Sequence, residues 1–188
     1  LGGELVPGKG VVEVEKRRTL TSTLLAGEMV KADSYLVAAS LAHGIGKLVL
    51  AEMSPYSYFA ALKTALEQSS SLASEEEAIF GISHHEVGKL WLAKHRLDTS
   101  LRQTAMFYNN LEEYQGMVPG LVAIASHVVR LYGIGFTGDP VLNVRDIWDT
   151  PVWTKLSSHC KNLSLGADFM ESEFVPLIGT LPHFKIPS

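Results

Sequence analysis

Cysteine is almost absent from this sequence of 188 residues, in which Cys160 is the single example. One cysteine cannot form a disulfide within the chain, which fits a reducing compartment. It is also weak evidence for a catalytic thiol, because no histidine–asparagine pattern accompanies it. The adjacent His159 would point away from it on a helix. We therefore exclude a disulfide scaffold and disfavour thiol catalysis.

The sequence also lacks an excess of positive charge and an uninterrupted apolar run. Its formal net charge is -4, which gives no electrostatic reason to expect nucleic-acid binding. Residues 1–10 are rich in glycine and lack the apolar centre of a secretory signal. The longest apolar runs, 35–53 and 117–134, both contain His and Lys or Arg, so we expect neither to cross a membrane. These absences predict a soluble, cytoplasmic protein.

Apolar residues recur at helical spacing over most of the chain, and the longest strand-like alternation covers only residues 10–14. Residues 35–50 are apolar on nearly every face, which predicts a central, buried helix. The full set of expected helices is 13–31, 35–50, 56–68, 74–80, a helix starting at residue 84, 99–108, 120–132, 145–158 and 167–178.

Local signals predict where several of these helices begin. Ser54-Pro55 combines a capping residue with proline at the first helical position. Residues 74–77 and 83–86 each have the Ser-x-x-Glu spacing of a capping box. Asp98 can cap the helix at 99–108. The apolar face expected for the helix at 56–68 consists of Tyr58, Phe59, Leu62 and Leu66.

Polar residues on the apolar helices are the candidates for chemistry. His43 is followed by Gly44-Ile45-Gly46-Lys47, and its imidazole could be a metal ligand. The hard cations that hydrolyse phosphoesters also need oxygen ligands, normally carboxylates. The inward polar positions of the later apolar helix are Ser126 and His127, and those of the first long helix are Arg18 and Thr19. None of these residues is a carboxylate.

Residues 42–47, Ala-His-Gly-Ile-Gly-Lys, resemble the His-Asp-Ile-Gly-Lys signature of the HD superfamily of metal-dependent phosphohydrolases. Residues 75–97, with Glu77, Gly81, His84 and the Glu-Val-Gly at 86–88, are more similar still to the HDOD branch, found in bacterial signalling proteins. The resemblance covers roughly residues 14–138. It implies an all-α, HDOD-like helical bundle, and the family usually has a further N-terminal helical lobe that we expect this sequence to start too late to include.

The resemblance also implies that most of the metal ligands of the superfamily are lost. His43 matches the histidine of the His-Asp pair, but the aspartate is Gly44, and the first histidine of the site falls at Arg18. The last aspartate falls at Ser126 or His127. The paired histidines that often follow the second motif become Tyr108-Asn109, and the Gly-Tyr-Pro segment of the cyclic-dinucleotide phosphodiesterases is absent.

Each candidate also has a purely structural interpretation. We expect His43 to be a buried, hydrogen-bonded core residue and His84 to be partly exposed at a helix start. We attribute Glu86 to its capping box, and Lys47 to a salt bridge or to a favourable charge at a helix C-terminus. The tryptophans Trp91, Trp148 and Trp153 are expected in the core or at an interface rather than stacked on nucleic-acid bases. A site formed by His43, His84 and His127, suited to zinc, nickel or iron, is the sharper but less favoured hypothesis.

The sequence therefore predicts an HDOD-like core at residues 14–140, with a helical extension at 141–188 packed on it. We expect a regulatory module that binds a signalling protein or a small ligand through a degenerate pocket formed by Arg18, His43, Gly44, Lys47, His84, Tyr108, Ser126 and His127. No catalytic residue, cofactor or metal is expected. The alternative is a metal-dependent phosphohydrolase that acts on a nucleotide or phosphoester. Whether two copies form a homodimer is left open.

Overall fold

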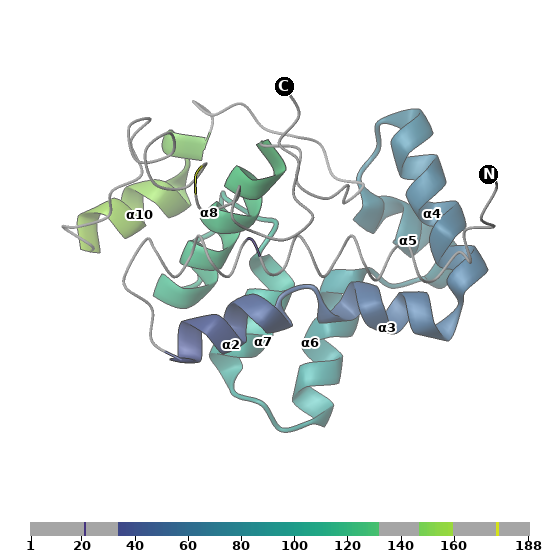
Figure 1. The fold of residues 1–188 in the computed structure, drawn as a ribbon, viewed down its shortest axis with the longest axis horizontal. Coiled ribbons are helices and arrows are strands. Elements are labelled where there is room, and N and C mark those ends of the chain that lie inside the picture. The colour runs from purple at the N-terminus through teal and green to yellow at the C-terminus, as the bar shows by residue number, and fades with distance from the viewer. Residues whose placement is uncertain (1–20, 22–33, 132–146, 160–175, 177–188) are drawn as a thin grey trace.

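The computed structural model describes residue 21, residues 34–131 and 147–159, and residue 176, and these residues form an all-helical fold (Figure 1). Nearly all of the expected helix at 13–31, and of that at 167–178, lies outside this part of the chain. The helices with defined bounds are α2 Ser34–Ala42, α3 Ile45–Met53, α4 Pro55–Gln68, α5 Leu72–Phe80, α6 His84–Lys94, α7 Thr99–Phe107, α8 Met117–Leu131 and α10 Pro151–His159.

The single helix predicted at 35–50 is wrong, because the chain turns at His43 and Gly44 and forms α2 and α3 on either side (Figure 1). Gly44 occupies the N-cap position of α3, with φ -90° and ψ 7°. Its carbonyl accepts a hydrogen bond of 3.1 Å from the Lys47 N–H. Hydrophobicity alone could not locate this break, since the residues on both sides are apolar.

Three of the predicted helix starts are confirmed, one is corrected, and one predicted capping box is not formed. α4 begins at Pro55 after Ser54, and the Asp98 carboxylate caps α7 by accepting a 3.0 Å hydrogen bond from the Leu101 N–H. α5 begins earlier than predicted because Ser71, rather than Ser74, is its N-cap. Ser83 does occupy the N-cap of α6, but its side chain makes no capping hydrogen bond, so this capping box is not formed.

The helices in the C-terminal half of the chain also begin at other residues than predicted. α8 begins at Met117, three residues before the predicted start. The helix expected at 145–158 is interrupted at Asp149 and Thr150, after which α10 begins at Pro151. α10 packs on α8 at Gly120, where an added Cβ would meet the Val152 side chain at 3.3 Å. The boundary at residue 140 stays a prediction.

The buried apolar residues form two clusters. The first includes α8, buried from Pro119 to Arg130, together with residues of α2, α10 and the segment after α7. The tryptophans Trp148 and Trp153 pack against it, with their ring centroids 4.6 Å apart. The second cluster joins α3, α4 and the start of α5. Helices α6 and α7 lie between these regions and bring the polar residues of both motifs together.

The outer face of α4 departs from the prediction. Tyr58 is buried as expected, and Leu62 packs against the second cluster. Phe59 and Leu66 are instead about half exposed or more, at 49% and 61%. The small residues Ala61 and Ala65 are buried in their place.

One stretch of the described residues, Ser34–Met53, is long and apolar enough to cross a membrane by length and composition. Half of the tested window is buried inside the protein. A core segment of a soluble protein passes the same test, and this stretch is divided by the turn at His43. It is therefore weak evidence for a membrane span, and the cellular location stays a prediction.

Candidate functional site

Two glycines allow α3 and α6 to cross at unusually short range. A Cβ added to Gly46 would lie 1.8 Å from the carbonyl oxygen of His84 and 2.7 Å from the backbone nitrogen of Gly88. Atoms that are not bonded do not approach this closely, so only glycine fits at position 46 in this arrangement. The crossing brings the start of α6 against the start of α3, and thus His84 towards His43.

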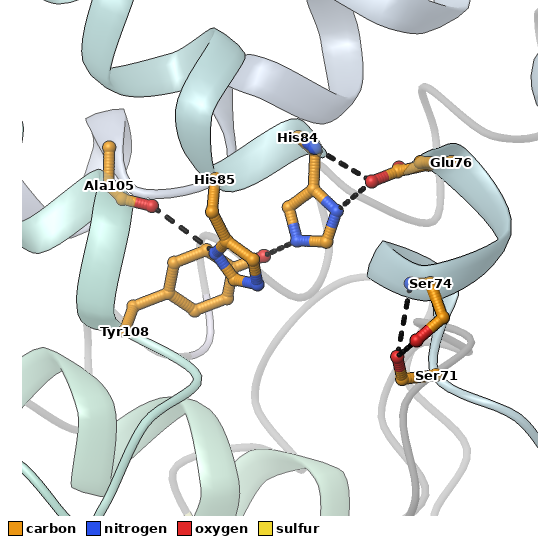
Figure 2. A network of polar contacts seen from close by, with 7 residues as sticks. All are labelled: Ser71, Ser74, Glu76, His84, His85, Ala105 and Tyr108. Atoms are coloured by element: carbon orange, nitrogen blue, oxygen red, sulfur yellow. Dashed lines mark hydrogen bonds and ion pairs between the residues drawn. The ribbon is translucent and has the colours of Figure 1, made fainter. Parts of the chain in front are cut away.

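A chain of buried hydrogen bonds connects three helices at this crossing (Figure 2). The Glu76 carboxylate of α5 accepts a hydrogen bond of 2.7 Å from the backbone N–H of His84 and contacts the His84 Nδ1 at 2.5 Å. The other ring nitrogen, Nε2, lies 2.9 Å from the hydroxyl of Tyr108, which follows α7. The tautomer that satisfies both contacts has Nδ1–H donating to the carboxylate and Nε2 accepting from the hydroxyl. We call Glu76, His84 and Tyr108 the buried relay.

All three members of the buried relay are almost fully removed from solvent, with exposed fractions of 0%, 1% and 0% in chain order. A carboxylate, an imidazole and a hydroxyl in this order resemble the arrangement that activates a nucleophile. The Tyr108 hydroxyl cannot act in this way towards an external substrate, because the residue is enclosed. The relay instead satisfies buried polar groups and fastens α5, α6 and the end of α7 to one another.

The ring of Tyr108 fills the space between the residues of the two motifs. Its centroid lies 4.7 Å from that of His43, in an edge-on arrangement, and 5.0 Å from that of His85. The Lys47 Nζ lies 5.9 Å from the same centroid. The residue at the position of a family histidine thus occupies the centre of the cluster with an apolar ring.

The structure supports the core interpretation of His43 and corrects that of Lys47 and His84. His43 is 1% exposed, and its Nδ1 is hydrogen-bonded to the carbonyl of Ser40. Lys47 is also 1% exposed, but it lies in the first turn of α3, so the explanation by a C-terminal helix dipole is wrong. His84 is buried rather than partly exposed. The capping role assigned to Glu86 is not observed either, since Ser83 makes no side-chain capping bond.

Ser126 and His127 are buried in α8, as packed polar residues. Their exposed fractions are 0% and 5%, and the His127 Nδ1 lies 2.8 Å from the Ala123 carbonyl in the preceding turn. Within residues 34–131 and 147–159, no three His, Cys, Asp or Glu residues are arranged to hold a metal ion. His43, His84 and His127 therefore do not form the three-histidine site. Arg18 lies outside the described residues.

The comparisons with known proteins agree with this arrangement. A model of the HDOD domain matches residues 10–111, which is more than half of the chain. The chain belongs to the HDOD domain family.

A crystal structure of an HDOD domain protein of unknown function from Geobacter sulfurreducens is similar to this chain, with a TM-score of 0.68 and 21% sequence identity. The match covers 90% of this chain and 63% of the other protein, so the present chain spans less than two thirds of that protein. At this identity the likeness establishes the all-α HDOD fold alone. A search among curated proteins finds no match.

The HDOD core of this chain has an open cleft beside the buried relay. Its volume is about 400 Å³, within the usual range for ligand pockets. It lies between α5, the start of α6 and the end of α7. The residues that line it are Ala73, Glu77, Ser83, His85, Glu86, Met106, Phe107, Asn109 and Asn110.

Sequence reasoning missed Glu76 and His85 as site residues. Glu76 lies in a run of three glutamates, and only its spacing of four residues from the apolar Leu72 indicates that it faces inward. His85 is half-buried, lines the cleft and has its Nδ1 3.4 Å from the Ala105 carbonyl. The expected pocket residues that the structure describes are enclosed, whereas the sequence neighbours of His84 and Tyr108 line the cleft.

Proposed function

We propose that this HDOD chain is a non-catalytic regulatory module of cytoplasmic signal transduction in bacteria, which binds a partner protein. The observation that carries the proposal is the closed buried relay. Its one carboxylate, Glu76, is already bonded to His84, and the second ring nitrogen of His84 is bonded to Tyr108. In a catalytic site, such side chains would hydrogen-bond to substrate. Here Glu76, His84 and Tyr108 hydrogen-bond to one another.

The residues at this position do not fit the metal centre that the HD superfamily implies. The position of the paired aspartate is Gly44, and the His43 Nδ1 is bonded to the backbone of Ser40. The aromatic ring of Tyr108 lies between the two motifs, next to His43 and His84. It occupies the position at which the superfamily often has a histidine ligand. A bridging metal and its activated water would lack their main carboxylate anchor here.

We further propose that the partner binds at the open cleft rather than among the enclosed residues of the expected pocket. The cleft is accessible, and the relay beneath it fixes the three elements that form its walls. Rigid walls lower the entropic cost of binding, because fewer side chains and loops must be ordered by the partner.

Hydrolysis assays test the non-catalytic part of the proposal. We expect no release of product from phosphomonoesters, phosphodiesters or cyclic dinucleotides in the presence of Mn²⁺ or Fe²⁺, relative to a heat-inactivated control. Turnover that is abolished by both His43→Ala and His84→Ala would instead support the alternative, a metal-dependent phosphohydrolase.

Site-specific cross-linking tests the binding part. A photo-reactive amino acid replaces Lys89, which is exposed one turn beyond Glu86 on α6, or Lys155, an exposed control position on α10. In cells, we expect one discrete cross-linked protein from position 89 and none from position 155. Equal labelling at both positions would contradict binding at the cleft.

A further inference from the structure

The open cleft carries two carboxylates and no Lys or Arg, and His85 is the one other titratable side chain in its lining. Glu77 and Glu86 contribute carboxylates, both residues are exposed, and no Lys or Arg lines the cleft. A cleft lined by one sign of charge attracts ligands of the opposite sign and raises their local concentration. Its ligand is therefore expected to be a cation.

The position of Glu77 is unfavourable for the helix that carries it. It lies in the last turn of α5, where the backbone carbonyl groups already present partial negative charge. Glu86, in contrast, lies in the first turn of α6, where an acidic side chain is favoured. Glu52 and Glu67 likewise lie in the last turns of α3 and α4, but Glu77 is the one that lines the cleft, together with Glu86.

A third acceptor lies beside the carboxylates. Asn109 also lines the cleft, and its Oδ1 atom is buried and has no hydrogen-bond partner within the described part of the chain. A buried acceptor of this kind is costly unless a donor reaches it. A ligand that enters the cleft with several N–H donors would satisfy it.

The remaining lining restricts the shape of the cation. Met106 and Phe107 add apolar surface from the end of α7. A thioether and an aromatic ring suit the aliphatic stem and the flat face of a guanidinium group. An arginine side chain combines such a stem with five N–H donors in a planar fork, which carboxylates bind in pairs. A metal ion would not use the apolar surface, and lysine lacks the planar fork.

We propose that the cleft binds the side chain of an arginine on an exposed segment of the partner protein. The guanidinium lies between Glu77 and Glu86 and donates to Asn109, and its stem packs on Met106 and Phe107. This inference rests on the proposed function, because it names the chemistry of the partner at the same cleft.

Titration of the complete ¹⁵N-labelled chain with capped amino acids tests the inference. The probe is N-acetyl-L-arginine methylamide, and the matched control is the citrulline analogue, which has the same shape without the charge. We expect saturable amide shifts at residues 83–86 and 106–110 with the arginine probe only, weakened by added salt. Free L-arginine, whose carboxylate would meet the acidic walls, is expected to bind more weakly than the capped probe.

Variants locate the effect. Glu77→Gln and Glu86→Gln are each expected to weaken binding on the order of threefold to tenfold, as for partly exposed charge-assisted hydrogen bonds. Glu52→Gln, an exposed change on α3 outside the cleft lining, is expected to leave the affinity unchanged. All three side chains are exposed, so the fold should be retained, and the amide spectrum checks this directly.

The inference is overturned by equal binding of the citrulline analogue, by shifts confined to other residues, or by wild-type affinity in both cleft variants. Tighter binding of free L-arginine would overturn the assignment to a protein segment. These failures differ from failure of the proposed function. Absence of arginine binding together with a discrete cross-link at position 89 would leave the regulatory function standing, whereas metal-dependent hydrolysis would remove it.

Discussion

Replacement of Gly46 by alanine tests the close crossing of α3 and α6 most strictly. The added Cβ would lie 1.8 Å from the His84 carbonyl oxygen, whereas real Cβ atoms essentially never approach within 3.0 Å, so the shortfall is 1.2 Å. The obstructing atom belongs to the backbone of α6 and cannot rotate away. The two helices must therefore separate, and the buried relay that begins at His84 must move with α6.

The magnitude follows from two opposing terms. Alanine in place of glycine favours a helix by about 1 kcal/mol. Overpacking of a tight interior costs about 1–3 kcal/mol and occasionally more, and a backbone–backbone clash belongs at the upper end. We expect the clash to prevail, with a net loss of about 2–3 kcal/mol in the free energy of unfolding. For a chain of this size, that corresponds to a Tm lower by about 4–12 °C.

Gly88→Ala is the matched control for this prediction. Its added Cβ would lie 3.3 Å from the Ala105 side chain and from the Gly46 nitrogen, so a small adjustment suffices. The gain in helix propensity then roughly offsets the strain, and we expect a Tm within about 3 °C of wild type. Thermal and urea unfolding followed by circular dichroism measure both variants. A Gly46→Ala protein as stable as wild type would refute the tight crossing, as would equal losses in the two variants.

Two further predictions concern hydrogen bonds that the structure shows. Tyr108→Phe removes the donor to the buried His84 Nε2, so unfolding should become easier by about 1–3 kcal/mol, measured by urea denaturation; no change would contradict the relay. The hydrogen bond from Tyr35 lowers the pKa of Asp98 below its ordinary value of 3.8, so Asp98 contributes stability above that pH and loses it as the pH falls through the lower folded pKa. The Tm of wild type should thus exceed that of Asp98→Asn by its full amount at pH 7, and this difference should shrink below pH 3.8. An NMR titration that gives the Asp98 carboxyl a pKa at or above 3.8 would contradict this prediction.

The all-α class and the HDOD family could be predicted from the sequence, because helical spacing and the two motifs are both local patterns. The turn between α2 and α3 could not be predicted from hydrophobicity, since residues 35–53 are apolar on both sides of it. It depends on the contact between Gly46 and the backbone of α6, which joins segments far apart in the sequence.

The candidate site was predicted in part, for a similar reason. His43 and Tyr108 were identified from the motifs, and both do lie together. Glu76 was missed because the start of α5 was placed at Ser74, which leaves Leu72 outside the helix. Without Leu72, nothing marks which of the three glutamates lies on the buried face. The true N-cap, Ser71, sets Leu72 and Glu76 on the same buried face. The open cleft is formed by three elements, and no single segment of the sequence indicates it.

We propose, as the central claim, that the HD-type pocket of this HDOD chain no longer serves catalysis and that the side chain of Tyr108 fills it. Metal content per chain, measured by elemental analysis after purification without chelators, tests it most directly. We predict well under one equivalent of Fe, Mn or Zn in the wild-type protein, and no gain in the Gly44→Asp variant, whose backbone conformation any residue can adopt. About one equivalent of metal per chain that is lost in His43→Ala, or metal binding with hydrolysis restored by Gly44→Asp, would contradict the claim.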